Sequence, residues 1–325
     1  MKVLILGGLG FIGFRLAQKL QEENVSIDII DYNELKSISL KDQAFFQKSY
    51  HRYFQYDLSN INSNFKIDTD YDYIFHFAAL LGVETVLKNP YDVMKKNCLM
   101  TINALELAKT QKNLKKLIFT STSEVYAGTL YHYSIDFPTP ETTPLTVSSL
   151  ENSRTSYMLS KIYGEALCQY ADIPFVILRP HNIYGPRMGK RHVIPQLLEK
   201  IHFLNHNDTL EVYSPTHQRT FCYIDDAVNY IIKLMGCSER NITLNLGVAS
   251  PEISMKDLAE QLIQITEKNI HIQPMPDTPG SPPRRAPKTK DLIAITNYTP
   301  QISLNDGLKK TYEWYRDNQF NRELP

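Results

Sequence analysis

Short apolar runs alternate with longer amphipathic segments over the first 180 residues. Apolar runs typical of buried strands occur at 3–6, 26–30, 73–77, 117–120 and 175–178. Between them, apolar side chains recur at helical spacing over 11–23, 91–110 and 155–170. This alternation predicts an α/β fold in which helices cover both faces of a doubly wound parallel sheet.

The pattern changes after Pro180, where loops lengthen and a proline-rich stretch spans 274–287. A smaller mixed α/β lobe at the C-terminal side is therefore expected. We assign residues 1–178, together with 221–246, to the first domain, and 179–325, mainly 179–220 and 247–325, to the second. Ser303 resembles the start of a capping box and predicts a C-terminal helix.

A glycine-rich turn joins the first predicted strand to the first predicted helix. Residues 7–13 read GGLGFIG and place Gly7, Gly10 and Gly13 at three-residue intervals. Such a turn lets backbone N–H groups reach a pyrophosphate at a helix N-terminus, as in Rossmann-type domains. Asp31 follows 21 residues after Gly10 and ends the second strand. A carboxylate there can accept the adenosine ribose hydroxyls and repels a 2′-phosphate, which predicts NAD rather than NADP.

Charge and cysteine content narrow the possible functions. Lys and Arg number 35, as do Asp and Glu, so the net charge is zero. Such a chain has no overall field for nucleic acid or an anionic membrane, and an anionic ligand must be held by local groups. The four cysteines are widely spaced, which favours free thiols in the cytoplasm over disulfides or structural zinc.

Several further motifs occur in a fixed order along the chain. These are Asp57-Leu58, HFAA at 76–79, Asn97, STSEVY at 121–126, Tyr157-x-x-x-Lys161, RPHNIYGPRM at 179–188 and RTFCYIDD at 219–226. Together they resemble the extended short-chain dehydrogenase/reductase family, in its NAD-dependent epimerase/dehydratase branch that acts on nucleotide sugars. The likeness runs from Lys2 to about Trp314.

The resemblance implies a set of cofactor-binding residues. Asp57 and Leu58 would lie beside the adenine, and the residues after His76 would line the cofactor site, whereas His76 itself is expected in the core. The complete set comprises Gly7, Gly10, Phe11, Ile12, Gly13, Asp31, Asp57, Leu58, Phe77, Ala78, Ala79, Asn97, Tyr157 and Lys161.

Tyr157 and Lys161 stand four residues apart, so on a helix they share one face. A phenol with its ordinary pKa of about 10 is a poor base at neutral pH. A nearby ammonium and the positive nicotinamide favour the phenolate. The resemblance implies that Tyr157 takes the sugar hydroxyl proton, that Thr122 binds the same oxygen, and that transient oxidation at C4 gives a 4-keto sugar with NAD recycled.

Glu124 bears on what happens to that 4-keto sugar. In the 4,6-dehydratases that this chain resembles, a glutamate here removes the C5 proton. Ser123, however, stands where those enzymes carry an aspartate. The T-S-E sequence, Arg154 and the GPRM sequence also resemble nucleotide-sugar decarboxylases. We therefore expect epimerase/dehydratase chemistry, with UDP-glucuronate-type decarboxylation as the alternative and a non-catalytic NAD-binding sensor or scaffold as a second alternative.

The nucleotide sugar would be held by local donors. The resemblance implies substrate contacts from Thr122, Asn182, Arg187, Arg219 and Arg285, and the choice between Arg284 and Arg285 for the diphosphate stays open. His202 and His206 lack the glutamate of an H-E-x-x-H motif, so no metal site is expected. The family further implies a homodimer built through a four-helix bundle that includes residues 91–110 and the helix of Tyr157.

Overall fold

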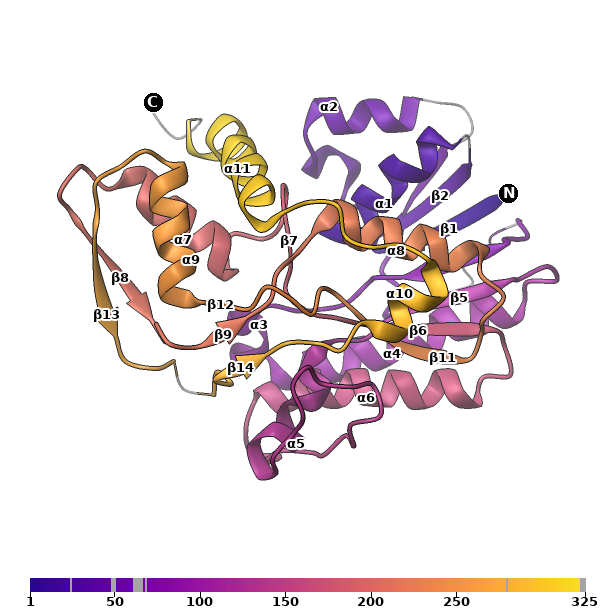
Figure 1. Cartoon of the computed structure of the whole chain (residues 1–325). Helices are drawn as coiled ribbons and strands as arrows, with labels where there is room; N and C mark the ends of the chain where they lie inside the picture. Colours follow the sequence, from indigo (N-terminus) through magenta and orange to yellow (C-terminus); the bar gives the residue numbers. More distant parts are fainter. Residues whose placement is uncertain (24, 48–50, 61–66, 68, 279, 322–325) are drawn as a thin grey trace. The chain divides into compact units, whose positions relative to one another are not determined.

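The structure is a computed structural model that describes residues 1–325 except 24, 48–50, 61–66, 68, 279 and 322–325 (Figure 1). The chain divides into two compact units. The first comprises Met1–His132, Pro144–Pro180 and Tyr230–Leu244, and the second comprises Tyr133–Thr143, His181–Asn229 and Asn245–Pro325. The domain bounds expected from sequence stay a prediction.

The first unit is built on alternating strands and helices. Its elements are β1 (Lys2–Leu6), α1 (Phe11–Glu22), β2 (Ser26–Asp31), η1 (Leu35–Ser37), α2 (Leu40–Gln43), η2 (Ala44–Gln47), β3 (His51–Gln55), β4 (Tyr73–His76), α3 (Val83–Lys88), α4 (Pro90–Lys109), β5 (Lys116–Thr120), η3 (Ser123–Tyr126), α5 (Ala127–His132), α6 (Arg154–Tyr170) and β6 (Phe175–Pro180). Helix α8 (Ile224–Gly236) and strand β11 (Ile242–Leu246) each contribute part of their length to this unit.

Seven strands form one sheet in the order β11-β6-β5-β4-β1-β2-β3. The pairings from β6 across to β3 are parallel. The chain winds outward in both directions from the junction of β1 and β4, so the predicted doubly wound Rossmann-type sheet is confirmed. In such a sheet, ligands bind beyond the carboxyl ends of the strands at this junction.

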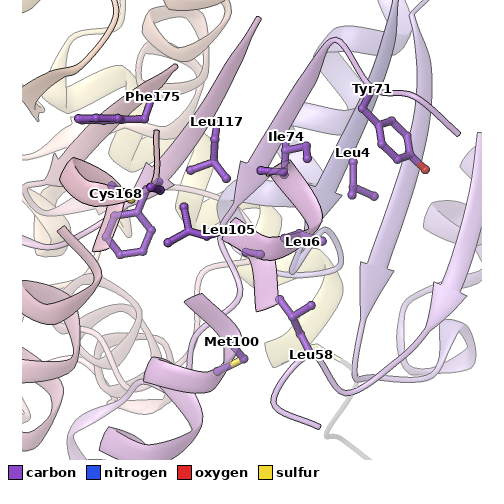
Figure 2. Packing of buried hydrophobic residues seen from close by; sticks show 14 of the residues in the cluster. Leu4, Leu6, Leu58, Tyr71, Ile74, Met100, Leu105, Leu117, Cys168 and Phe175 are labelled. Atoms are coloured by element: carbon purple, nitrogen blue, oxygen red, sulfur yellow. The ribbon is translucent and has the colours of Figure 1, made fainter. Parts of the chain in front are cut away.

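Alternation along each strand divides the apolar side chains between the two faces of the sheet. Leu4 and Leu6 belong to a buried cluster that also contains residues of α4 and α6, including Leu105 and Cys168 (Figure 2). Figure 1 shows α4 and α6 on one side of the sheet and α1 on the other. Because α6 lies against β5 and β6, its side chains are fixed relative to the ends of these strands.

The second unit contains shorter elements. They are β7 (Ile183–Tyr184), α7 (Val193–Phe203), β8 (Thr209–Tyr213), β9 (Gln218–Arg219), β10 (Cys222–Tyr223), β12 (Ile253–Ser254), α9 (Met255–Ile265), β13 (His271–Met275), β14 (Arg284–Arg285), α10 (Lys290–Thr296), α11 (Leu304–Tyr315) and the π-helical turn η4 (Arg316–Phe320). The expected C-terminal helix is confirmed as α11, where the Ser303 side chain accepts a hydrogen bond from Asp306 N.

Two strands of the sheet have no counterpart among the segments expected from sequence. Strand β3 reads HRYFQ and β11 reads ITLNL, and both lie at the edges of the sheet. An edge strand has a neighbour on one side only, so it does not require the continuous apolar run that predicts a central strand.

Close packing of α6 against β5 leads to a stability prediction. A Cβ at Gly164 would lie 2.5 Å from Cζ of Phe119, a fully buried ring. Gly164→Ala should therefore lower the free energy of unfolding by about 1–3 kcal/mol in urea denaturation. Gly236→Ala is the control, because a Cβ there meets nothing within 4 Å, and it should leave stability unchanged or raise it by up to about 1 kcal/mol. Equal effects of the two substitutions would contradict this packing.

Candidate active site

The glycine turn after β1 has no room for larger residues. Gly7 has φ of +81°, and a Cβ at this position would lie 2.6 Å from Ala78 N, in the segment after β4. A Cβ at Gly13 would lie 2.6 Å from Gly7 O. Gly10 precedes α1 without a side-chain cap, so the first N–H groups of the helix have no side-chain acceptor there. This turn fits a pyrophosphate, which needs close backbone approach and helix N–H donors.

The carboxylate at the end of β2 is tied to the same turn. Asp31 Oδ2 accepts a hydrogen bond from Leu9 N at 3.0 Å, and Oδ1 accepts one from Asn33 N at 3.0 Å. Asp31 is buried at this end of the sheet. The structure thus brings Asp31 next to the glycine turn, as a residue that reads the adenosine ribose requires.

The segment after β4 is held by Asn97 of α4. The Asn97 side chain accepts a hydrogen bond from Leu80 N at 2.7 Å and donates to Leu80 O at 3.0 Å. It also donates to Ser160 Oγ of α6 at 3.2 Å. Asn97 therefore fixes the chain that follows Phe77, Ala78 and Ala79, and its own contact with the cofactor stays a prediction.

Asp57 and Leu58 lie in the turn after β3 and differ in burial. Asp57 is exposed and accepts hydrogen bonds from Ser59, whereas Leu58 belongs to the buried apolar cluster. His76 is 1% exposed, in agreement with its expected place in the core. The proximity of Asp57 and Leu58 to an adenine stays a prediction.

Four predicted catalytic side chains lie on two neighbouring segments of the first unit. Thr122 and Glu124 belong to the turn after β5, and Tyr157 and Lys161 belong to α6. Lys161 Nζ donates a hydrogen bond to Thr120 O at 2.7 Å and lies 6.0 Å from the Tyr157 ring centroid. Thr122 and Tyr157 are joined by a side-chain hydrogen bond. The structure therefore brings the four residues together, while their catalytic roles stay proposals.

The electrostatics of Tyr157 differ from the expectation that Lys161 makes the phenol acidic. Desolvation and the Glu124 carboxylate raise the pKa of Tyr157 above its ordinary value, and only the hydrogen bond with Thr122 lowers it. The reason is geometric, since the Lys161 ammonium is directed to the Thr120 carbonyl rather than to the phenol. The chain's own groups thus favour the neutral phenol.

The ammonium of Lys161 is itself buried. Burial lowers the pKa of Lys161 to about 8, while Cys168 and Glu165 raise it. The neighbouring His76 has its pKa lowered to about 3 by burial and by the Lys161 charge, so its ring is neutral at physiological pH. Glu124 Oε1 lies 4.0 Å from Nη2 of Arg154.

The second unit contains the residues predicted to bind the nucleotide sugar. Strand β14 pairs in parallel with β9, so that Arg285 lies opposite Arg219 and Arg284 opposite Gln218. Arg284 donates to both carboxylate oxygens of Glu252, at 2.7 and 2.5 Å. Because successive strand residues point to opposite faces, Arg285 shares a face with Arg219 rather than with Arg284. This arrangement favours Arg285 for the diphosphate.

The remaining predicted substrate residues have unusual backbone conformations. Asn182 and Arg187 have φ of 44° and 68°, in the left-handed region. Asn182 Nδ2 donates to Thr220 O at 2.9 Å, next to Arg219. Arg219 donates to Ser281 Oγ at 3.1 Å and to Pro282 O at 2.6 Å. Among the described residues there is no group of three potential metal ligands, and none of the helices is long and apolar enough to cross a membrane.

Three residues beside the catalytic segment were not predicted from sequence. Ser121, Glu165 and Arg179 form a buried hydrogen-bonded group next to Thr122. The available signal was that Glu165 continues the four-residue spacing of Tyr157 and Lys161 along one helix face.

Comparison with known proteins agrees with this geometry. Residues 3–247 match the family described as the NAD dependent epimerase/dehydratase family. This chain belongs to that family. Its members bind NAD, and the glycine turn with Asp31 in this chain fits that cofactor.

This chain is similar to curated proteins that have several different activities. It is 31% identical to a UDP-N-acetyl-alpha-D-glucosaminuronate decarboxylase of Bacillus cytotoxicus, over 97% of this chain and 98% of that protein. It is 29% identical to UDP-glucuronic acid decarboxylase 3 of Arabidopsis thaliana, over 97% of this chain and 89% of that protein. A solved structure of a UDP-glucuronic acid 4-epimerase variant from Bacillus cereus, in complex with UDP-4-deoxy-4-fluoro-glucuronic acid and NAD, matches with a TM-score of 0.82 at 25% identity. That match covers 98% of this chain and 99% of the other.

The position of Asp31 predicts how this family member selects its cofactor. Asp31→Asn removes the negative charge that repels a 2′-phosphate and weakens a charge-assisted acceptor. The NAD dissociation constant should rise about tenfold, and the ratio of NADP to NAD affinity should rise with it. Isothermal titration with both cofactors measures this. The control Asp72→Asn removes a carboxylate that precedes β4, at the amino ends of the strands and away from the glycine turn. An unchanged affinity ratio in Asp31→Asn would contradict the assignment.

Proposed function

We propose that this protein oxidises C4 of a nucleotide sugar, converts the resulting 4-keto sugar and reduces it again. The observation that carries the proposal is the common site formed by Thr122, Glu124, Tyr157 and Lys161 on η3, its N-cap and α6. Membership of the NAD dependent epimerase/dehydratase family supports it. NAD, when bound, supplies the oxidising capacity at C4 and returns the sugar to its original oxidation level.

The cofactor would be held by residues at the junction of β1, β2 and β4. The turn containing Gly7, Gly10 and Gly13 would receive the pyrophosphate, because the start of α1 has no side-chain cap and a Cβ at Gly7 or Gly13 would collide with backbone atoms. Asp31 would accept the adenosine ribose hydroxyls. Lys161 would donate to the second ribose while its charge remains close to the phenol.

The proton chemistry falls to Tyr157 and Thr122. Thr122 would hold the C4 oxygen of the sugar by a hydrogen bond, and Tyr157 would take the hydroxyl proton during oxidation and return it during reduction. Because the chain raises the pKa of the phenol, the positive charge of a bound oxidised nicotinamide is needed to favour the phenolate. The base is thereby active only when the cofactor is bound in its oxidised form.

For the 4-keto sugar, decarboxylation is the outcome that we propose first. A uronic acid oxidised at C4 is a β-keto acid, which loses CO₂ without a further acid or base. Dehydration across C5 and C6 needs both a base and an acid, and Ser123 offers no acidic group beside Glu124. The curated decarboxylases among the relatives support this choice of a UDP-linked uronic acid as substrate.

Epimerisation at C4 is the second candidate. It needs only that the 4-keto sugar be presented to the cofactor by its other face before reduction. The structural similarity to a UDP-glucuronic acid 4-epimerase and 28% identity to a UDP-glucuronate 4-epimerase of Thermodesulfobacterium geofontis support it. Both candidates use Thr122, Tyr157 and Lys161 in the same way and act on the same class of substrate.

Two broader properties also belong to this proposal. A homodimer through α4 and α6 is supported by exposed apolar side chains on these helices, among them Met94 and Tyr163. On α4, Leu99 and Ile102 are also partly exposed, whereas Leu105 and Ala108 lie in the buried cluster of the first unit.

Location in the cytoplasm is supported by the four free cysteines.

A product assay tests the proposed function. The purified protein with NAD is incubated with UDP-glucuronate, UDP-N-acetylglucosaminuronate, UDP-glucose and dTDP-glucose, and products are separated and analysed by mass spectrometry. A mass loss corresponding to CO₂ identifies decarboxylation, and an isomer of unchanged mass identifies epimerisation. Tyr157→Phe should lower kcat by a factor of about 1,000 or more, since it removes the proton-transfer group, while NAD affinity stays within about threefold. Near-normal turnover in this variant would refute the assigned base.

The two arginines of β14 provide a matched test of substrate binding. Arg285→Met should raise the KM for the nucleotide sugar about 10- to 100-fold, because a charged hydrogen-bond donor to the diphosphate is lost, with little change in melting temperature. Arg284→Met breaks the ion pair with Glu252 and should affect stability rather than KM. A larger KM effect from Arg284→Met would reverse the assignment of the diphosphate contact.

A further inference from the structure

We propose that Glu165 and Arg179 are positioning residues that, through Ser121 and Tyr126, fix the segment carrying Thr122 and Glu124 against the helix carrying Tyr157 and Lys161. The inference rests on the proposed function for the roles of those four side chains. It adds two residues, neither of which is expected to touch the substrate or the cofactor.

The contacts hold the segment on both sides of Thr122 and Glu124. On one side, Ser121 Oγ donates a hydrogen bond to Glu165 Oε1 at 2.5 Å. On the other, Arg179 Nη1 donates to the Tyr126 hydroxyl at 2.7 Å, and the guanidinium carbon lies 5.0 Å from the centroid of the Tyr126 ring. Residues 122–124 thus lie between Ser121 and Tyr126, which are each held by a side-chain hydrogen bond.

The two residues that make these contacts, Glu165 and Arg179, form an ion pair with each other. Arg179 Nε and Nη2 donate to Glu165 Oε1 and Oε2 at 2.9 and 2.6 Å, a two-pronged contact that fixes both side chains in orientation. Glu165 belongs to α6 and Arg179 to β6, and both are buried. The ion pair therefore joins α6, β6 and the turn after β5 through directed hydrogen bonds.

Stability alone is a weak reason for such a buried pair. Removing charges from water is costly, and apolar residues of similar volume often replace a buried ion pair with no loss of stability. Orientation is what an apolar pair cannot supply, since only directed hydrogen bonds reach Ser121 and Tyr126. Catalysis depends on such orientation, because a misplacement of about 1 Å can lower the rate by about 100-fold.

Glu165 also lies one helical turn from Lys161. The Lys161 ammonium faces Tyr157, Glu165 and Cys168 on α6, His76 on β4, and the Thr120 carbonyl and Phe119 ring on β5. Of these, the Glu165 carboxylate, which is paired with Arg179, favours the ammonium, as does Cys168. Loss of this charge lowers the pKa of Lys161, so activity that needs the ammonium should fall at a lower pH.

The test compares three variants with the wild type. Ser121→Ala removes the hydrogen bond from residue 121 to Glu165 and leaves the Glu165–Arg179 ion pair intact. Glu165→Gln removes the charge, and the double variant Glu165→Leu with Arg179→Met replaces the pair by apolar groups of similar size. Thr311→Val is the control, since it removes a buried hydroxyl from α11 in the second unit. For each we measure kcat, NAD affinity, melting temperature, the pH profile of kcat and amide hydrogen exchange in residues 120–126.

We expect Ser121→Ala and the double variant to lower kcat about 10- to 100-fold, with NAD affinity within about threefold. Hydrogen exchange in residues 120–126 should accelerate in both, whereas Thr311→Val leaves it unchanged. Glu165→Gln should also shift the alkaline limb of the kcat profile to lower pH. A double variant that keeps wild-type exchange and kcat would overturn the positioning role. If the wild type converts no nucleotide sugar, the proposed function fails, and accelerated exchange still supports the anchoring.

Discussion

Desolvation of the Tyr157 phenol beside the Glu124 carboxylate is the constraint on which the account of this site depends. Both effects favour the neutral phenol. Lys161 does little to lower the pKa of Tyr157, because its ammonium donates to the Thr120 carbonyl. With the chain's own groups alone, the phenol is a poor base at neutral pH. In the proposed function, the phenol becomes a base when the positive charge of the oxidised cofactor lies next to it, so that proton transfer depends on bound NAD.

The sheet explains how this constraint is built. Because the strands are parallel, their carboxyl ends point the same way. The turns after β1, β4 and β5 therefore lie at the same side of the first unit. Glycine in the first turn allows close approach of backbone groups, and Asn97 fixes the second turn. The third turn carries Thr122 and Glu124 and is fastened to α6 and β6 by the Glu165–Arg179 pair. The residues proposed for cofactor binding and for proton transfer therefore lie on neighbouring turns of one sheet.

The sequence was sufficient for the central strands, the long helices and the residues with strong motifs. Continuous apolar runs identify β1, β2, β4, β5 and β6, and the glycine spacing identifies the turn after β1. The edge strands β3 and β11 lack such runs. The direction of the Tyr157 pKa could not be obtained from spacing, because it depends on which acceptor the Lys161 ammonium reaches. Likewise, the choice of Arg285 needed the pairing of β14 with β9, which no local pattern encodes.

The most direct test is a titration of Tyr157 itself. Protein labelled with ¹³C at the tyrosine ζ carbon is followed by NMR from pH 6 to 11, and the Tyr157 signal is assigned by its absence in Tyr157→Phe. The account predicts that the signal remains that of a neutral phenol throughout this range in the cofactor-free protein, and that it titrates at lower pH once NAD is bound. A cofactor-free Tyr157 that ionises near neutral pH would contradict it.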